Sequence, residues 1–369
     1  MRWYPKAFTQ LIGMHDCYGE AFRRVMRSGM FLNGTETKSF EEEWAAYLNV
    51  DPGTIILTSS GTTAIELVLR NLMFLSGDPN RDQVIVQSFA PSAVGCAILN
   101  AGLYPYFVDV DHRYQMDLDQ VEEILDRQSS RILAIIIIHT FGMEAPIERL
   151  RLIREAYDNR IFLIEDCSHA HGLKIGQSMA GTFADYSVWS FYPTKNLPAI
   201  GDAGAVYASA YAREIRAMGQ YGWVDGERSS RHLGGSNCRC DELQAAFLRE
   251  GLKYLDSWNN IRRGLAAAYM GQLERDLFRF PAYGVNCVFH QFPVRVDTPY
   301  IDGFFAALVI SSVARRIYLP LHQQPLFKAY AAMDMTSTEW LYKYTAFLPM
   351  HPGIIESQGD IIEELNTYG

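Results

Sequence analysis

The sequence predicts an α/β protein whose central sheet is largely parallel. Short β-branched or aliphatic runs (TIILT, QVIVQ, YPYFVDV, ILAIIIIH and RIFLIE) alternate with stretches in which apolar side chains recur at helical spacing, which is the pattern of βαβ units. The run ILAIIII contains no polar residue and is therefore typical of a strand buried on both faces of such a sheet. In chain order, the predicted strands are 54–58, 83–87, 104–110, 132–139 and 160–165, and the predicted helices are 62–74, 90–101, 117–127 and 147–157.

The second half of the chain has a different pattern, which predicts a second domain. A polar stretch rich in Gly and Ser at 222–237 indicates a long loop, and a long helix is expected from Asp241 through Trp258. Short strands within 285–296, further helices and proline-marked turns follow. We therefore expect a large domain, 1–255, that includes an N-terminal helical segment, and a smaller C-terminal α+β domain, 256–369.

Composition excludes several functional classes. The net charge is −9 and no run of Lys or Arg occurs, so nucleic acid is not an expected partner. The longest aliphatic run has seven residues, far fewer than the about 20 that a membrane helix needs, and MRWYPKAFTQ is not a signal peptide. The six cysteines are scattered along the chain and are interpreted as reduced thiols. We expect a cytoplasmic protein with no membrane partner.

Four segments follow predicted strands, where open α/β sheets bind their ligands. The first, SSGTT at 59–63, precedes a helix, so its backbone N–H groups and the helix N-terminus can hold an anion. An ordinary N-cap is the alternative interpretation. The segment is neither a dinucleotide fingerprint nor a P-loop, so it does not indicate NAD or ATP.

The second segment is EDCSHAHG at 165–172. An acidic residue at the end of a buried strand needs a cationic partner, and Asp166 facing a protonated ring nitrogen meets that need. Cys167, His169 and His171 look like metal ligands, but no second Cys/His cluster accompanies them at a usual spacing. No metal is therefore expected here.

The third segment, WSFYPTKN at 189–196, contains a lysine, and the fourth, QSFAP at 87–91, contains an aromatic residue. Lys195 lies among aromatic, proline and small residues, where a lowered pKa would make its amine a nucleophile; a lysine that reaches into solvent at a loop edge is the alternative. Phe89 follows a strand and is either core or a stacking platform. Together with Asp166 and SSGTT, these residues supply what pyridoxal 5′-phosphate (PLP) needs.

The chain resembles the DegT/DnrJ/EryC1/StrS family of PLP-dependent nucleotide-sugar aminotransferases, which have the type I fold of PLP enzymes. The resemblance covers nearly the whole sequence and rests on FLNGTETKSFEEEWAAYLNV, SSGTTAIELVL, EDCSHAHG, WSFYPTKNLPAIGDAGAV and GGSNCRCDELQAAFL followed by LDSWNNIRR. It implies a large domain with a mostly parallel central sheet and a smaller C-terminal α+β domain.

The resemblance also implies a role for individual residues. Lys195 would be the lysine that bonds to the cofactor and moves the proton, and Asp166 would keep the pyridine nitrogen protonated. His169 stands where the family usually has Gln in contact with the ring 3′-oxygen. The remaining implied cofactor contacts are Ser60, Gly61, Thr62 and Ser190 for the phosphate, Phe89 and Ser168 for the two ring faces, and Asn237 for the phosphate of the neighbouring subunit's cofactor. The last contact implies a homodimer with shared active sites.

The implied reaction transfers the amino group of L-glutamate to a keto sugar linked to a nucleotide. FYPTKNLPAIGDAGA and LDSWNNIRR resemble members that act on 3-keto sugars, whereas the segment 316–324 is shorter than the family pattern. A 4-keto sugar and a cyclitol ketone stay open as acceptors. So do a pyridoxamine-dependent dehydratase, which would have His in place of Lys195, a non-catalytic homologue that binds PLP or sugar nucleotide, and a zinc hydrolase built on Asp166, His169 and His171.

Overall fold

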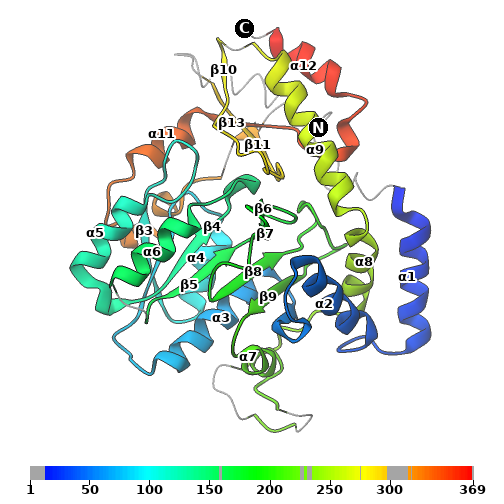
Figure 1. Ribbon diagram of the computed structural model, residues 1–369, viewed down its shortest axis with the longest axis vertical. Coiled ribbons are helices and arrows are strands. Elements are labelled where there is room, and N and C mark those ends of the chain that lie inside the picture. Colours follow the sequence, from blue (N-terminus) through cyan, green and yellow to red (C-terminus); the bar gives the residue numbers. More distant parts are fainter. Residues whose placement is uncertain are drawn as a thin grey trace.

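The central feature of the computed structural model is a seven-stranded sheet with helices on both faces (Figure 1). The structure describes residues 13–157, 160–224, 228–230, 235–274, 276–296, 315–316 and 318–367. The strands of the sheet, in spatial order, are β1 (Ile55–Thr58), β9 (Gly204–Ala208), β8 (Tyr186–Ser190), β5 (Phe162–Asp166), β4 (Ile132–Ile138), β2 (Gln83–Gln87) and β3 (Tyr104–Val108). All neighbours pair in parallel except β9, which is antiparallel to both β1 and β8. The predicted α/β fold with a mostly parallel sheet is confirmed.

Four helices of this part alternate with the strands as the sequence pattern predicts: α3 (Gly61–Ser76), α4 (Ser92–Asn100), α5 (Leu118–Gln128) and α6 (Ile147–Tyr157). The helix α7 (Ala212–Met218), which follows β9, was not predicted. The sequence pattern did not identify β8 and β9 as strands. Their segments, YSVWS and GAVYA, contain Ser, Gly and Ala, which are weak strand formers, and tertiary packing determines their conformation.

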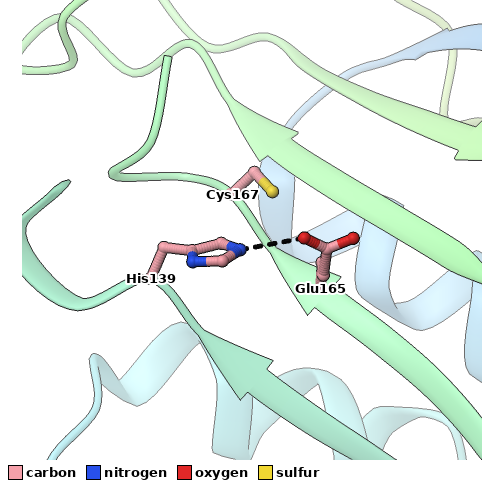
Figure 2. A group of neighbouring side chains, drawn as sticks. All are labelled: His139, Glu165 and Cys167. Atoms are coloured by element: carbon pink, nitrogen blue, oxygen red, sulfur yellow. Dashed lines mark hydrogen bonds and ion pairs between the residues drawn. The ribbon is translucent and has the colours of Figure 1, made fainter. Parts of the chain in front are cut away.

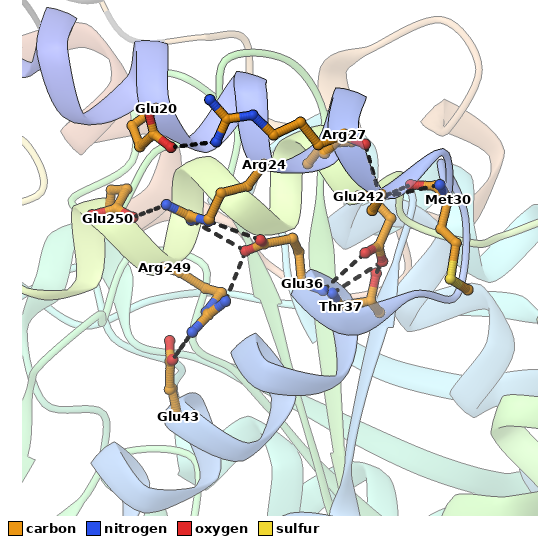
Figure 3. A network of polar contacts seen from close by, with 12 residues as sticks. Glu20, Arg24, Arg27, Met30, Glu36, Thr37, Glu43, Glu242, Arg249 and Glu250 are labelled. Carbon is orange, nitrogen blue, oxygen red and sulfur yellow. Dashed lines mark hydrogen bonds and ion pairs between the residues drawn. The ribbon is translucent and has the colours of Figure 1, made fainter.

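A network of ion pairs joins the two N-terminal helices to each other and to a later helix (Figure 3). They are α1 (His15–Ser28) and α2 (Thr35–Leu48), and both contact α8 (Glu242–Leu252). Arg24 of α1 binds Glu36 of α2 at 3.0 Å, and Arg249 of α8 binds the same carboxylate at 2.8 Å. Buried Glu242 accepts the N–H groups of Gly34, Glu36 and Thr37, so it caps the start of α2 from another helix.

The predicted helix from Asp241 through Trp258 is wrong in one respect, because the structure divides it. α8 ends at Leu252 and α9 (Leu255–Gln272) begins three residues later. Gly251 lies in the last turn of α8, where a Cβ would come within 3.2 Å of Leu197, so this crowded position holds the residue with the lowest helix propensity after proline.

The C-terminal part forms a second, antiparallel sheet in the order β10 (Phe278–Arg279), β11 (Phe292–Val296), β13 (Thr345–Leu348) and β12 (Arg315–Arg316). In Figure 1, α9 leads from α8 toward this sheet and α12. The other elements outside the central sheet are β6 (Lys174–Ile175), β7 (Ser178–Met179), α11 (Thr336–Tyr344) and α12 (Gln358–Asn366). A domain boundary at residue 255 stays a prediction. It coincides with the first residue of α9, yet aromatic side chains of both parts share one core, with the rings of Phe141 and Phe347 5.0 Å apart.

Membrane insertion was not expected from the sequence. Over the ranges given above, the structure has no helix long and apolar enough to cross a bilayer.

Candidate active site

A cavity opens at the carboxyl edge of the central sheet. It lies where β4, β5 and β8 end, which is the edge at which parallel strands of an open sheet present their ligands. Its lining residues are Gly61, Thr62, Ile65, Pro91, Ala93, Val94, Ile138, Asp166, Ser168, His169, Ser190 and Lys195. The structure thus brings seven of the ten predicted site residues to one cavity: Gly61, Thr62, Asp166, Ser168, His169, Ser190 and Lys195.

The N-terminus of α3 forms one end of the cavity. Ser60 is its N-cap and accepts the N–H of Thr63, so the side chain of Ser60 is engaged in the helix cap. The N–H groups of Gly61 and Thr62 belong to the first turn, which has no intrahelical partners for its donors. Because these donors and the helix dipole favour negative charge, this end of the cavity suits a phosphate.

Two glycines make this arrangement possible. A Cβ on Gly61 would lie 2.7 Å from the Cβ of Ser190, and a Cβ on Gly204 would lie 2.3 Å from the carbonyl carbon of Ser60. The first residue of β9 therefore packs directly beneath the turn that begins α3. This close approach places the α3 N-terminus beside the Ser190 hydroxyl.

Asp166 and Lys195 are the carboxylate and the amine that line the cavity. Asp166 is buried at the end of β5, and one of its carboxylate oxygens accepts the N–H of Ser168 at 2.9 Å. Lys195 is partly exposed and lies on the connection between β8 and β9, where its N–H donates to the carbonyl of Tyr192. Burial of its surroundings lowers the pKa of Lys195 to about 8, and the charge of Asp166 opposes this shift. A substantial fraction of the amine is therefore neutral near physiological pH.

Three predicted site residues lie outside the lining of the cavity. Phe89 is 1% exposed, and its ring packs against Tyr114 at 5.3 Å within an aromatic core cluster. Asn237 is exposed, pairs with Gln220 in an isolated β-bridge and accepts a hydrogen bond from Arg239. Ser60 acts as a helix cap, as described above. The cofactor contacts assigned to these three residues stay predictions.

The structure gathers a different Cys/His/acid group from the one that the sequence pointed to (Figure 2). Within the described ranges, the potential ligand atoms that lie within 4.8 Å of one another are those of His139, Glu165 and Cys167, and no such group contains Asp166, His169 and His171. His139 Nδ1 accepts the N–H of Ala145, so its proton is on Nε2, which lies 2.9 Å from Glu165. Glu165 and Cys167 are the chain neighbours of Asp166, so this group lies next to the residue that lines the cavity.

Hydrogen bonds engage the potential ligand atoms of His139 and Glu165. Glu165 also accepts the N–H groups of Gly181, Phe183 and Ala184, and both nitrogens of His139 are engaged. Burial and the neighbouring carboxylates raise the pKa of Cys167, which keeps it a thiol. Glu165 and His139 instead anchor the turn at 181–184 against the strand that presents Asp166.

The apolar wall of the cavity was not predicted from the sequence. It consists of Ile65, Pro91, Ala93, Val94 and Ile138. Ile138 is the last residue of β4, and Pro91 precedes α4, so their positions at a strand end and a helix start were the available signal. Single apolar residues of this kind are common in any core, and only the fold distinguishes them.

The cavity fits PLP on three counts. Lys195 supplies an amine with a lowered pKa, Asp166 supplies a carboxylate for the ring nitrogen, and the α3 N-terminus, kept open by Gly61 and Gly204, supplies phosphate donors. These are the groups that PLP enzymes provide.

Comparison with known proteins gives the same result. The profile of the DegT/DnrJ/EryC1/StrS aminotransferase family matches residues 16–366. The chain is 33% identical over 344 residues to the UDP-N-acetyl-3-dehydro-alpha-D-glucosamine 3-aminotransferase of Acidithiobacillus ferrooxidans, covering 91% of this chain and 89% of the relative. It is 30% identical over 357 residues to the 3-oxo-glucose-6-phosphate:glutamate aminotransferase of Bacillus subtilis, covering 92% and 77% of the two chains.

A solved structure extends these matches to the cofactor. The crystal structure of NtdA from Bacillus subtilis with bound cofactor PMP has a TM-score of 0.86 and 26% sequence identity to this chain, covering 97% of this chain and 82% of NtdA. The match spans both the central sheet and the C-terminal part. The chain belongs to the DegT/DnrJ/EryC1/StrS aminotransferase family and is a PLP-dependent sugar aminotransferase.

Proposed function

We propose that this enzyme transfers the amino group of L-glutamate to the 3-keto group of a nucleotide-linked deoxysugar. The observation that carries the proposal is the joint placement of Lys195, with its lowered pKa, and Asp166 in the strand-end cavity. The 3-keto position is favoured because the names of both relatives given above place the ketone at C3. The motif FYPTKNLPAIGDAGA favours the same position.

Lys195 would act first as a nucleophile and then as a base. Its neutral amine would be the nucleophile toward the cofactor, and once free of the cofactor the same amine would be placed to move a proton. Bound PLP supplies the electron sink that makes the α-hydrogen of the donor acidic. The buried Asp166 carboxylate would hold a proton on the pyridine nitrogen, and the Ser168 N–H fixes the orientation of this carboxylate.

The phosphate would bind at the start of α3. We assign this contact to the first-turn N–H groups of Gly61 and Thr62 and to the hydroxyl of Ser190, all of which line the cavity. The apolar wall formed by Pro91, Val94 and Ile138 would exclude water beside a bound cofactor. The exclusion of water strengthens the interaction between Asp166 and the ring nitrogen.

The proposed enzyme is a homodimer in which Asn237 reaches the cofactor of the neighbouring subunit. The segment 22–32 supports this proposal because it exposes five large apolar side chains, each 45–51% accessible: Phe22, Met26, Met30, Phe31 and Leu32. Asn33, which follows this segment, donates to Gln220 at 3.0 Å, and Gln220 pairs with Asn237. The apolar segment and Asn237 therefore belong to one continuous surface that a second copy would cover.

Absorption spectroscopy tests the first half of the reaction. The purified protein with PLP should be yellow, and addition of L-glutamate should bleach the colour in a single turnover. K195A should bind PLP without the colour change, whereas K174A, a variant of an exposed lysine on β6, should behave like the wild type. A wild-type protein whose spectrum L-glutamate leaves unchanged would refute the assignment of the donor.

The choice of acceptor requires a second experiment. The bleached enzyme should regain its colour with a UDP- or dTDP-linked 3-keto sugar. The candidate favoured by the Bacillus subtilis relative is a 3-keto sugar 6-phosphate, which would restore the colour without any nucleotide. Recovery with a 4-keto nucleotide sugar alone would overturn the 3-keto proposal.

We also propose a cytoplasmic location. All six cysteines lie in the part of the chain that the structure describes and are unpaired there, as expected where thiols stay reduced.

A further inference from the structure

Two buried histidines from distant parts of the chain stack beside Lys195. His169 follows β5 and lines the cavity, whereas His290 precedes β11 of the C-terminal sheet. Their ring centroids are 4.2 Å apart and their planes differ by 21°. The ring of Phe141 is nearly parallel to that of His169, at 12° and 6.2 Å. His169 is thus held in a stack to which three separate segments contribute.

The hydrogen bonds of His169 determine where its proton lies. Its Nδ1 is 3.3 Å from the backbone N–H of Phe141, which can only donate. Nδ1 must therefore be the acceptor, and the proton of the neutral ring is on Nε2. Phe141 has φ +59° and Gly142 has φ +87°, so a left-handed stretch of backbone presents this N–H.

The partners of His290 determine the opposite tautomer. Its Nδ1 is 3.3 Å from Oδ1 of Asn196, the residue after Lys195. The amide nitrogen of Asn196 donates to Oδ1 of Asn259 and to the carbonyl of Val288, both at 2.8 Å, so its oxygen must face His290. Because this oxygen can only accept, Nδ1 of His290 carries the proton.

Backbone bonds fix the two segments to each other. The N–H of His290 donates to the carbonyl of Phe141 at 3.0 Å, and the N–H of Val288 donates to that of Gly142 at 3.1 Å. A Cβ on Gly142 would lie 2.7 Å from Val288, so only glycine permits this approach. The Phe141 N–H that binds His169 is therefore held in place by the segment that contains His290.

Both rings are surrounded by groups that oppose a positive charge on them. Burial, followed by the charges of Lys195 and His171, lowers the pKa of His169 well below its usual value. Burial also lowers the pKa of His290, and His169, Lys195, Arg262 and His171 add to that effect. Asp166, three residues before His169, is the acidic group in the same cavity.

We propose that His290 is a positioning residue: with the backbone of Phe141, it holds His169 as a neutral ring whose Nε2–H is a fixed donor toward the cofactor site. A Gln at position 169 could present either its oxygen or its nitrogen to a ligand, whereas His169 held in this way presents a donor only. The C-terminal part thereby sets the hydrogen bonding of a residue in the cavity. The inference rests on PLP binding in this cavity, but its first test does not need the cofactor.

The first test measures tautomers in the cofactor-free protein. In a sample with ¹⁵N-labelled histidine, long-range ¹H–¹⁵N spectra should show the proton of His169 on Nε2 and that of His290 on Nδ1, with assignments from H169Q and H290Q. Neither signal should titrate between pH 6 and pH 9. A proton on Nδ1 of His169, or titration of His169 in this range, would overturn the proposal.

The second test keeps a flat ring at position 290 but removes its hydrogen bond to Asn196, which anchors the ring against His169. In H290F, the signal of His169 should split or move, and the pH at which the colour of the PLP-loaded enzyme changes should shift by about one unit, the equivalent of one ordinary hydrogen bond. H112F is the matched control and should leave both readouts unchanged. If a folded H290F has unchanged His169 signals and an unchanged colour transition, His290 serves only to fill the core and the proposal is wrong. Failure of the wild type to bind PLP would refute the proposed function and leave the tautomer result standing.

Discussion

Replacing Gly204 by Ala tests whether the contact between β9 and the start of α3 creates the phosphate site. The added Cβ would lie 2.3 Å from the carbonyl carbon of Ser60, 2.4 Å from its oxygen and 2.6 Å from the nitrogen of Gly61. All three are backbone atoms, and non-bonded carbon atoms prefer about 3.5–4.0 Å, so the α3 turn must move by roughly 1 Å. Such overpacking costs about 1–3 kcal/mol of stability.

The same movement should weaken phosphate binding. Losing one hydrogen bond to a charged group corresponds to about 1.5–3 kcal/mol, or about a tenfold to hundredfold rise in the dissociation constant. Pyridoxamine phosphate is the appropriate ligand because it does not bond to Lys195, and pyridoxamine without the phosphate is its control. We expect G204A to lose affinity for the former while its weak binding of the latter stays constant.

The matched control is Gly264, which is exposed on α9, and a Cβ added there would have none of the described atoms within 4 Å. G264A should be stabilised by about 0.5–1 kcal/mol, because alanine is the better helix former, and should bind the ligand normally. Calorimetry and fluorescence titration measure the two effects. A G204A protein with wild-type affinity for pyridoxamine phosphate, or with equal losses for both ligands, would refute the reasoning.

Three further predictions follow from other parts of the structure. Since the pKa of Lys195 is about 8, the neutral fraction of the amine rises about tenfold between pH 7 and pH 9, and the rate at which the cofactor-free enzyme binds PLP covalently should rise with it; a rate independent of pH would contradict this. E165Q should unfold about 3–5 kcal/mol more easily in urea, because it turns an acceptor of several N–H groups into a partial donor; unchanged stability would show that these bonds contribute little. E242A should lose about 1–2 kcal/mol through the uncapped start of α2, and E43A, which breaks a more exposed ion pair with Arg249, should lose less than about 1 kcal/mol; equal losses would contradict the capping argument.

The first half of the fold could be predicted because its elements carry strong local patterns. β4 is buried along its whole length and has a uniformly aliphatic sequence, and α3 to α6 follow strands at regular spacing. β8 and β9 lack such a pattern, and the close approach of Gly204 in β9 to the start of α3 is a tertiary contact that has no local signal. The sequence likewise does not show that Gly251, near the break between α8 and α9, lies so close to Leu197 that a Cβ would come within 3.2 Å of it.

The site was predictable to the extent that its residues follow strands in sequence. Asp166 and Ser190 end β5 and β8, so the topology brings them together. The contact between His290 and Asn196 joins positions 94 residues apart and has no local signal. For the same reason, the sequence could not show that Cys167 lies with His139 rather than with the histidines that follow it.

The antiparallel direction of β9 has a consequence for the order of folding. Ser190 at the end of β8 pairs with Gly204 at the start of β9, and the N–H of Phe191 donates to Ala203, so the segment that carries Lys195 is closed at its base by a local hairpin. Contacts of short sequence separation form faster than distant ones. The lysine loop can therefore close early, whereas the bonds of Asn196 to Asn259 and Val288 must wait until the C-terminal part has docked. We therefore expect the surroundings of Lys195 to be completed late in folding, when Asn196 forms these bonds.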